Sequence, residues 1–184
     1  MAILTYVIIG IIVLIVLYII LAYNRLIRLK LRIDNAWSQI DVQLKRRYDL
    51  IPNLIETVKG YVKHEKEVLT DITKTRSQLV SGNMQQKSKA SDQLTNALKT
   101  LFAVAENYPQ LRANENFKML QEELSGTESK IAYSRQFYND NVMMFNTAVQ
   151  SFPTNILASM FNFAQREFFK TEGKEKEPVK VNFN

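Results

Sequence analysis

The chain has no cysteine and a single histidine, His64. The lack of cysteine excludes disulfides and thiolate metal sites. A di-iron helical site needs two Glu-x-x-His pairs, and a zinc protease needs His-Glu-x-x-His, whereas position 68 is valine. Nucleophilic triads would have only His64 as a base, and no glycine-rich phosphate loop or dinucleotide fingerprint is present. We therefore expect no catalytic residues, no cofactor, no metal and no enzymatic activity.

Glycine and proline are scarce, at five and four of 184 residues. Apolar residues recur at steps of three and four, and no segment of useful length alternates with period two. These two observations predict an all-α fold and argue against a β-sheet.

Charge is missing from residues 3–23, which are mostly Ile, Leu, Val and Tyr. At about 1.5 Å per residue, these 21 residues make a helix of roughly 31 Å, which is enough to cross a bilayer core. No basic residue precedes the run, and Leu21-Ala22-Tyr23 is a poor cleavage site for a signal peptide. Residues 1–24 are therefore predicted to be an uncleaved, single-pass transmembrane anchor.

Four basic residues follow the run directly: Arg25, Arg28, Lys30 and Arg32. The positive-inside rule places the N-terminus outside and the rest of the chain in the cytoplasm. Residues 24–50 hold seven basic and three acidic side chains, which is +4 of the total +6. We expect these four basic residues to contact anionic lipid, and we expect the bilayer rather than nucleic acid to be the partner.

Four long helices are predicted, and the first of them includes the anchor. The first continues from the membrane to about Arg47, and the second starts near Ile51, with Asp49 as its cap and Pro52 in its first turn. The others cover about Met84–Glu106 and Asn114–Gln150, and a short helix covers about Asn155–Phe163. Their apolar faces predict an antiparallel four-helix bundle over residues 25–169, followed by a disordered tail at 170–184.

The densest cluster of charge is predicted at the end of the first helix. Its members are Asp41, Lys45, Arg46, Arg47 and Asp49. Asp41 and Lys45 are i,i+4 neighbours, and basic residues near a helix C-terminus favour the helix dipole. The cluster is either a structural staple of the hairpin or a site that binds a partner. Glu65, on the apolar face of the second helix, is expected to pair with a basic residue such as Arg76 or Arg135.

Aromatic residues gather at the other end of the sequence. They are Phe152, Phe161, Phe163, Phe168 and Phe169. Three interpretations stay open for this segment: it closes one end of the bundle, it lies in the membrane interface, or it contacts a second copy of the chain.

Three segments together resemble the LemA family of single-pass bacterial membrane proteins. They read AWSQIDVQLKRRYDLIPNLIETVKGYVKHEKEVL (36–69), AENYPQLRANENFKMLQEELSGTESKIAYSRQFYN (105–139) and FNTAVQSFPTNILASMFNF (145–163), closing with Glu167-Phe168-Phe169. Asn162 stands where the family commonly has glycine, and Phe145 where it usually has tyrosine. The resemblance implies an extracytoplasmic N-terminus, one anchor and a cytoplasmic four-helix bundle. It implies no assigned reaction, and it links relatives to membrane remodelling and to membrane metalloproteases.

Two functions are compatible with these features. The first is a membrane-anchored scaffold that organises membrane and self-associates as a homo-oligomer. The alternative is an adaptor or signalling module that binds a membrane protease or another membrane protein. The partner, the oligomer number and the stimulus are not encoded in any motif of the sequence.

Overall fold

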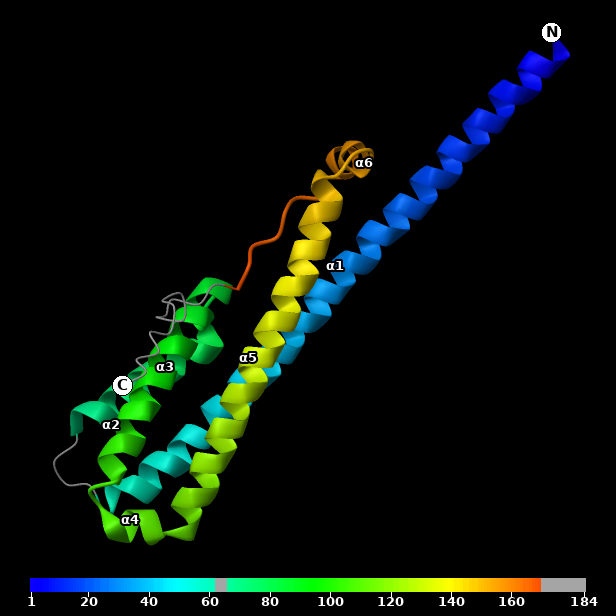
Figure 1. Cartoon of the computed structure of the whole chain (residues 1–184). Coiled ribbons are helices and arrows are strands. Elements are labelled where there is room, and N and C mark those ends of the chain that lie inside the picture. The colour runs from blue at the N-terminus through cyan, green and yellow to red at the C-terminus, as the bar shows by residue number, and fades with distance from the viewer. Residues whose placement is uncertain (62–65, 170–184) are drawn as a thin grey trace, which may run out of the picture. The chain divides into compact units, whose positions relative to one another are not determined.

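The computed structural model describes residues 1–61 and 66–169. Every regular element in these residues is an α-helix, which confirms the predicted all-α class. The helices are α1 (Ala2–Lys59), α2 (Lys66–Ser81), α3 (Met84–Ala105), α4 (Pro109–Ala113), α5 (Glu115–Gln150) and α6 (Thr154–Met160) (Figure 1). The predicted tail at 170–184 and the residues His64 and Glu65 lie outside the described residues.

The chain divides into two compact units, and α1 and α5 each contribute to both. The anchor unit comprises Met1–Gln39 and Ser134–Phe168. Among the described residues, the bundle unit comprises those of Ile40–Tyr133 and Phe169. We describe each unit separately.

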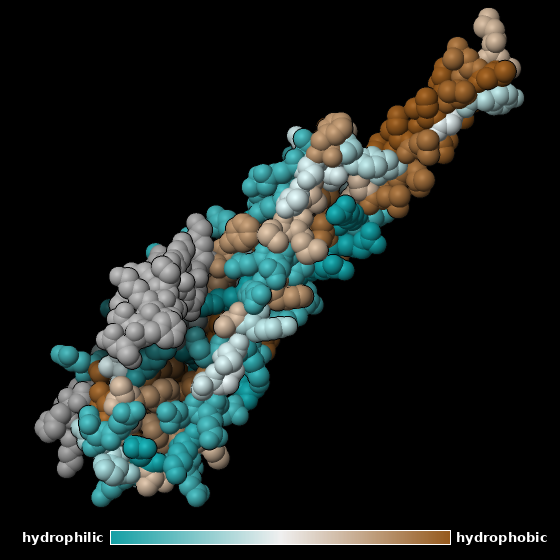
Figure 2. Space-filling model, viewed as in Figure 1, coloured by the Kyte–Doolittle hydropathy of each residue, from teal (hydrophilic) through white to brown (hydrophobic). Residues whose placement is uncertain are grey.

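In the anchor unit, α1 is the one described helix that is long and apolar enough to cross a membrane. None of its most apolar 18-residue window is buried, and this part of α1 forms a continuous hydrophobic surface (Figure 2). The prediction that one unbroken helix leads out of the apolar run is confirmed. A membrane-spanning helix is expected to expose such a surface, because lipid rather than protein covers it.

Beyond the apolar run, α1 packs antiparallel to the second part of α5 within the anchor unit. Trp37 meets Tyr138 of α5 at a ring-centroid distance of 6.1 Å, and Tyr23 meets Phe161, which directly follows α6, at 4.9 Å. The buried residues of α1 here are Ala22, Leu26, Leu29, Ile33 and Ala36. Those of α5 are Tyr138, Asn141, Val142, Phe145, Asn146 and Ala148. The alternating steps of four and three on α1 are those of a helix that packs nearly parallel or antiparallel to its neighbour.

In the bundle unit, parts of α1 and α5 pack with α2 and α3. Their apolar core comprises Ile40, Leu44, Ile51, Leu54, Ile55 and Val58 of α1, Ile72 and Leu79 of α2, Ala90, Leu94, Ala97, Leu98, Leu101 and Ala105 of α3, and Phe117, Leu124 and Ile131 of α5. The turn between α2 and α3 falls at Gly82 and Asn83. Asn83 then begins α3 with a capping box: its side chain accepts from the Gln86 N–H at 2.9 Å, and Gln86 Oε1 accepts from the Asn83 N–H at 2.9 Å.

The predicted helix break between Arg47 and Ile51 is wrong. Helix α1 continues through Pro52 to Lys59, so Asp49 lies inside a helix and does not cap one. Pro52 has no N–H to donate to the carbonyl of Tyr48, four residues earlier. Arg76 of α2 supplies the missing donor, because its Nε lies 2.9 Å from that carbonyl oxygen. Its guanidinium also lies 3.8 Å from the centroid of the Tyr48 ring.

The short C-terminal helix occurs as predicted but spans Thr154–Met160. It ends in a Schellman motif, in which the N–H groups of Phe163 and Asn162 donate to the carbonyls of Ala158 and Ser159, at 2.8 and 3.3 Å. Asn162 has φ of 56°, the left-handed conformation that this motif requires. Among residues with a side chain, asparagine tolerates this conformation comparatively well, so it can replace the glycine common in the family.

Candidate functional site

The charged cluster lies in the middle of α1, since the helix continues to Lys59. The expected benefit of Arg46 and Arg47 at a helix end is therefore absent. The structure forms two ion pairs in place of the expected Asp41–Lys45 pair. Lys45 pairs with Asp49 at 3.0 Å along the helix, and Lys87 of α3 pairs with Asp41.

Arg47 is the most deeply buried charged residue of the cluster, with 1% of its surface exposed. Its Nη1 lies 2.6 Å from Glu128 Oε2 of α5, 3.0 Å from the Thr95 hydroxyl and 3.5 Å from the carbonyl of Ser91. The Thr95 hydroxyl also lies 2.9 Å from Glu128 Oε2. A buried guanidinium requires such partners because desolvation disfavours an isolated charge. Arg47 therefore joins α1, α3 and α5 within the bundle unit.

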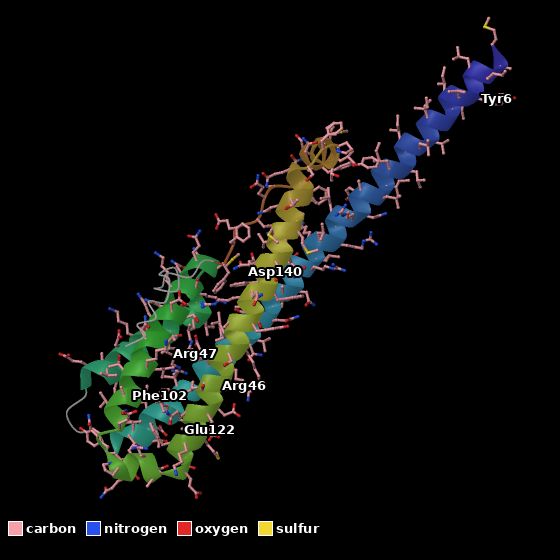
Figure 3. The ribbon with its side chains drawn as sticks, in the orientation of Figure 1. Tyr6, Arg46, Arg47, Phe102, Glu122 and Asp140 are labelled. Atoms are coloured by element: carbon pink, nitrogen blue, oxygen red, sulfur yellow. The ribbon has the colours of Figure 1, made fainter. Side chains whose placement is uncertain are left out.

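Arg46 projects from the same helix but stays at the surface (Figure 3). It pairs with Glu123 of α5 at 2.5 Å, and about half of each side chain is exposed, 46% and 50%. Exposed pairs of this kind contribute only about 0–1 kcal/mol to stability. Four of the five cluster residues thus keep an exposed or half-buried charge. Whether they bind a partner stays a prediction.

A pocket of about 510 Å³ lies beside Arg47 in the bundle unit, between α3 and α5. Leu98 and Phe102 of α3 form its apolar wall, and Glu122 and Ser125 of α5 form part of its polar side (Figure 3). The sequence did not point to this pocket. The sequence does hold one signal for the Arg47–Glu128 ion pair that lines the pocket. Glu128 occupies a position on the apolar face of its helix, where a buried ion pair is expected.

The predicted aromatic group separates into residues with different environments. Phe161 and Phe163 lie edge-on to the Tyr23 ring, at 4.9 and 5.8 Å, and Phe163 also meets Phe145 at 6.4 Å. Phe152 is 81% exposed, Phe168 is also exposed, and Phe169 is buried in the bundle unit. The residues that pack on Tyr23 hold α6 against α1 within the anchor unit.

A segment after α6 is attached to α5 by polar contacts. The Asn146 side chain makes two hydrogen bonds to the Arg166 backbone, at 2.8 and 2.9 Å, and the Tyr138 hydroxyl donates to the Glu167 carbonyl at 3.1 Å. The Arg166 guanidinium lies 3.7 Å from Asp34 of α1. Burial raises the pKa of Tyr138 above the usual tyrosine value, with Asp34 and Glu167 adding to the effect and Arg166 opposing it.

The predicted lipid-contact residues Arg25, Arg28, Lys30 and Arg32 are all exposed on α1. They occupy the two turns that follow the apolar run. Within the described residues, no group of three His, Cys, Asp or Glu side chains could hold a metal ion.

Comparison with known proteins gives several related sequences. Protein LemA of Metamycoplasma hominis is 29% identical over 161 residues, covering 85% of this chain and 72% of the relative. Magnetosome protein MamQ 2 of Paramagnetospirillum magneticum is 23% identical over 184 residues, covering 85% and 68%. Magnetosome protein MamQ of Magnetospirillum gryphiswaldense is 22% identical over 169 residues, covering 77% and 62%.

The family comparison covers most of the chain beyond the apolar run. The model of the LemA family matches residues 36–183. This range includes the Arg47 cluster, α2 to α6 and the segment attached to Asn146. The chain therefore belongs to the LemA family.

Proposed function

We propose that this protein is a non-enzymatic, membrane-anchored scaffold that associates with copies of itself. Its apolar run spans a bacterial cell membrane with the N-terminus outside, and its helical units lie in the cytoplasm. The basic residues that directly follow the run support this orientation.

The continuity of α1 carries this proposal. One helix of 58 residues supplies the exposed apolar run, the buried stripe of the anchor unit and a large share of the bundle-unit core. No loop separates the run from the residues that pack onto α5 in the anchor unit. The folded part of the anchor unit is thus held directly at the membrane, as ordered assembly on a membrane requires. Three of the relatives are named as magnetosome proteins, which agrees with a role in organising a cellular structure.

An exposed apolar face on α5 supports self-association. Phe137 and Met144, seven residues apart on one side of the helix, are both exposed in the anchor unit. Asp140, between them, also lies on this part of α5 (Figure 3). A contact between two copies buries apolar side chains, and Phe137 and Met144 are the large exposed apolar side chains on this side of α5 that such a contact would cover.

The test is the mass of the full-length protein extracted from membranes directly into polymer nanodiscs. We expect one homogeneous particle that contains an integer multiple of the 21.4 kDa chain. The variant Phe137→Ser/Met144→Ser should lower that number. The control Met119→Ser changes a more exposed apolar residue of α5 in the bundle unit and should leave the number of copies unchanged.

A particle with a single copy would overturn the self-association. If that single copy carried a second protein at a fixed ratio, the adaptor function would replace the scaffold. The identity of the second protein, such as a membrane protease, would then name the process.

A further inference from the structure

A second long stretch of the chain carries no charge. The 25 residues from Asn141 to Gln165 contain no Asp, Glu, Lys or Arg, although 23% of the whole chain is charged. The stretch comprises the end of α5, all of α6 and the turn after it. Lys, Glu, Arg and Asp usually populate surfaces in water, so a stretch without them is compatible with a lipid surface.

Contacts within the anchor unit fix α6 against the apolar run. The Tyr18 hydroxyl lies 3.1 Å from the Thr154 hydroxyl, at the first residue of α6. The Tyr23 ring packs edge-on against Phe161, directly after the last residue of α6. Both ends of α6 are therefore held beside the last two turns of the run.

These contacts determine the depth of α6 relative to the membrane. Tyr18 lies five residues inside the end of the run at Tyr23, which is about 7–8 Å along the helix. An amphipathic helix in a membrane interface buries its apolar face by about 5–10 Å. With the end of the run at the membrane boundary, the depth of the Tyr18–Thr154 contact falls within the range of an interfacial helix.

The two sides of α6 differ in the way that an interfacial helix requires. Leu157 and Ala158 are buried in the anchor unit. Ile156 and Met160 are exposed four residues apart on one face of α6, and Phe152, which precedes the helix, is exposed as well. Two of these are among the most exposed large apolar side chains outside the anchor, at 81% for Phe152 and 69% for Met160.

We propose that α6 is a lipid-binding foot, in which Phe152, Ile156 and Met160 enter the membrane interface beside the anchor. This inference rests on the proposed membrane-spanning role of residues 3–23. The exposed Arg25 and Arg28 follow at the level of the headgroups, so the foot is suited to a leaflet that contains anionic lipid. Lipid is a better match than a second protein, because the contacts of Tyr18 and Tyr23 continue the lipid-facing surface of the anchor into α6.

The lack of cysteine allows a direct test by site-specific spin labelling. Full-length Phe152→Cys, Ile156→Cys and Met160→Cys variants carry one nitroxide each in vesicles of phosphatidylcholine and phosphatidylglycerol. Electron paramagnetic resonance then measures collisions with oxygen, which enriches in lipid, and with a water-soluble nickel chelate. Val13→Cys, exposed in the apolar run, is the control for lipid, and Met119→Cys, exposed in the bundle unit, is the control for water.

We expect the oxygen-to-nickel accessibility ratio of the three foot positions to be several-fold higher than at Met119→Cys, and nearer to that of Val13→Cys. A ratio equal to that of Met119→Cys, with Val13→Cys in lipid, would overturn the foot but leave the anchor. A low ratio at Val13→Cys would overturn the anchoring itself. Low access to both reagents, with dipolar broadening between labels, would assign the face to a second copy and also overturn the foot.

Discussion

Arg46 and Arg47 are adjacent in the sequence but occupy opposite environments. Arg46 faces solvent and pairs with the half-exposed Glu123, whereas Arg47 is enclosed and bonds to residues of α3 and α5. The difference follows from helical geometry, since successive residues are about 100° apart and only one of them can face the core.

Replacing these two arginines one at a time should distinguish the stability contributed by the buried Arg47–Glu128 pair from that of the exposed Arg46–Glu123 pair. Arg47→Met leaves the Glu128 carboxylate without its ionic partner, and breaking a buried pair costs about 3–5 kcal/mol. Because one third of Glu128 is exposed to water, we expect a loss near the lower end of that range. Arg46→Met should cost at most about 1 kcal/mol. Urea unfolding of the full-length protein in detergent, followed by circular dichroism, measures both values.

The double variant Arg47→Met/Glu128→Leu is the control for this comparison. It removes both charges and should recover part of the loss, because no uncompensated charge then remains buried. Equal losses for Arg46→Met and Arg47→Met would show that the Arg47 ion pair adds nothing beyond a surface pair.

Tyr138 makes the stability of the anchor unit depend on alkaline pH. Its pKa in the folded protein is above the unfolded value of about 10, so the folded state retains the proton more strongly. The stabilisation that protonated Tyr138 contributes is complete at pH values below its pKa in the unfolded state. It is lost as the pH rises through the pKa of Tyr138 in the folded state. We therefore expect the free energy of unfolding to decrease more steeply above pH 10 in the wild type than in Tyr138→Phe.

Unfolding curves of the two proteins between about pH 8 and 11, a range that brackets the ordinary tyrosine pKa, test this expectation. Lysine deprotonation affects both proteins alike, so the difference between their slopes reports on Tyr138. At the lower end of the range, Tyr138→Phe should be less stable by about 0.5–1.5 kcal/mol, since it loses the hydrogen bond to the Glu167 carbonyl. Parallel pH profiles would refute the assignment of a raised pKa.

At the scale of elements, the interaction of Pro52 with Arg76 explains how α1 continues through a proline. A double-mutant cycle tests this explanation. Arg76→Met should destabilise the wild type by more than it destabilises the Pro52→Ala variant, because the alanine of that variant can donate its own N–H to the Tyr48 carbonyl. We expect the two losses to differ by about 1–2 kcal/mol in urea unfolding.

Lys74→Met is the matched control, since Lys74 is an exposed basic residue of the same helix. It should cost little in either background. An equal loss of the free energy of unfolding from Arg76→Met, with proline and with alanine at position 52, would contradict this explanation. That result would show that the Arg76 hydrogen bond to the Tyr48 carbonyl does not compensate for the N–H that Pro52 lacks.

Most helix positions could be predicted because the apolar period and the capping residues are local signals. Met84 and Gln150 are the predicted start of α3 and the predicted end of α5, and the structure has them there. The end of α1 could not be predicted, because the donor that satisfies Tyr48 lies 28 residues away in the sequence. The helix ends before Gly60 instead, where low helix propensity acts without such compensation. Helix α4 was missed because five residues are too few to show a period.

At the scale of the whole molecule, the family and the helical class were predicted and are confirmed, and the described residues contain the one predicted helix that is long and apolar enough to cross a membrane. The candidate site was predicted less well. The charged cluster was found by composition, but which of its residues is buried depends on how α3 and α5 pack against α1 in the bundle unit, and the local sequence does not encode that packing. The role proposed for the charge-free stretch around α6 depends on the contacts of Tyr18 and Tyr23, which the local sequence does not reveal.

The attachment of α6 to α1 makes the sides of the apolar helix different from one another. A lone transmembrane helix presents much the same cross-section to neighbours from every direction in the plane of the membrane. Here Thr154 and Phe161 occupy one flank of α1, at Tyr18 and Tyr23, and the remaining flanks expose only the apolar side chains of the helix. In the proposed membrane-spanning role, lipids and other copies of the chain would therefore meet a different surface on each side of the helix. A row of such molecules in one membrane would have a direction as well as a spacing.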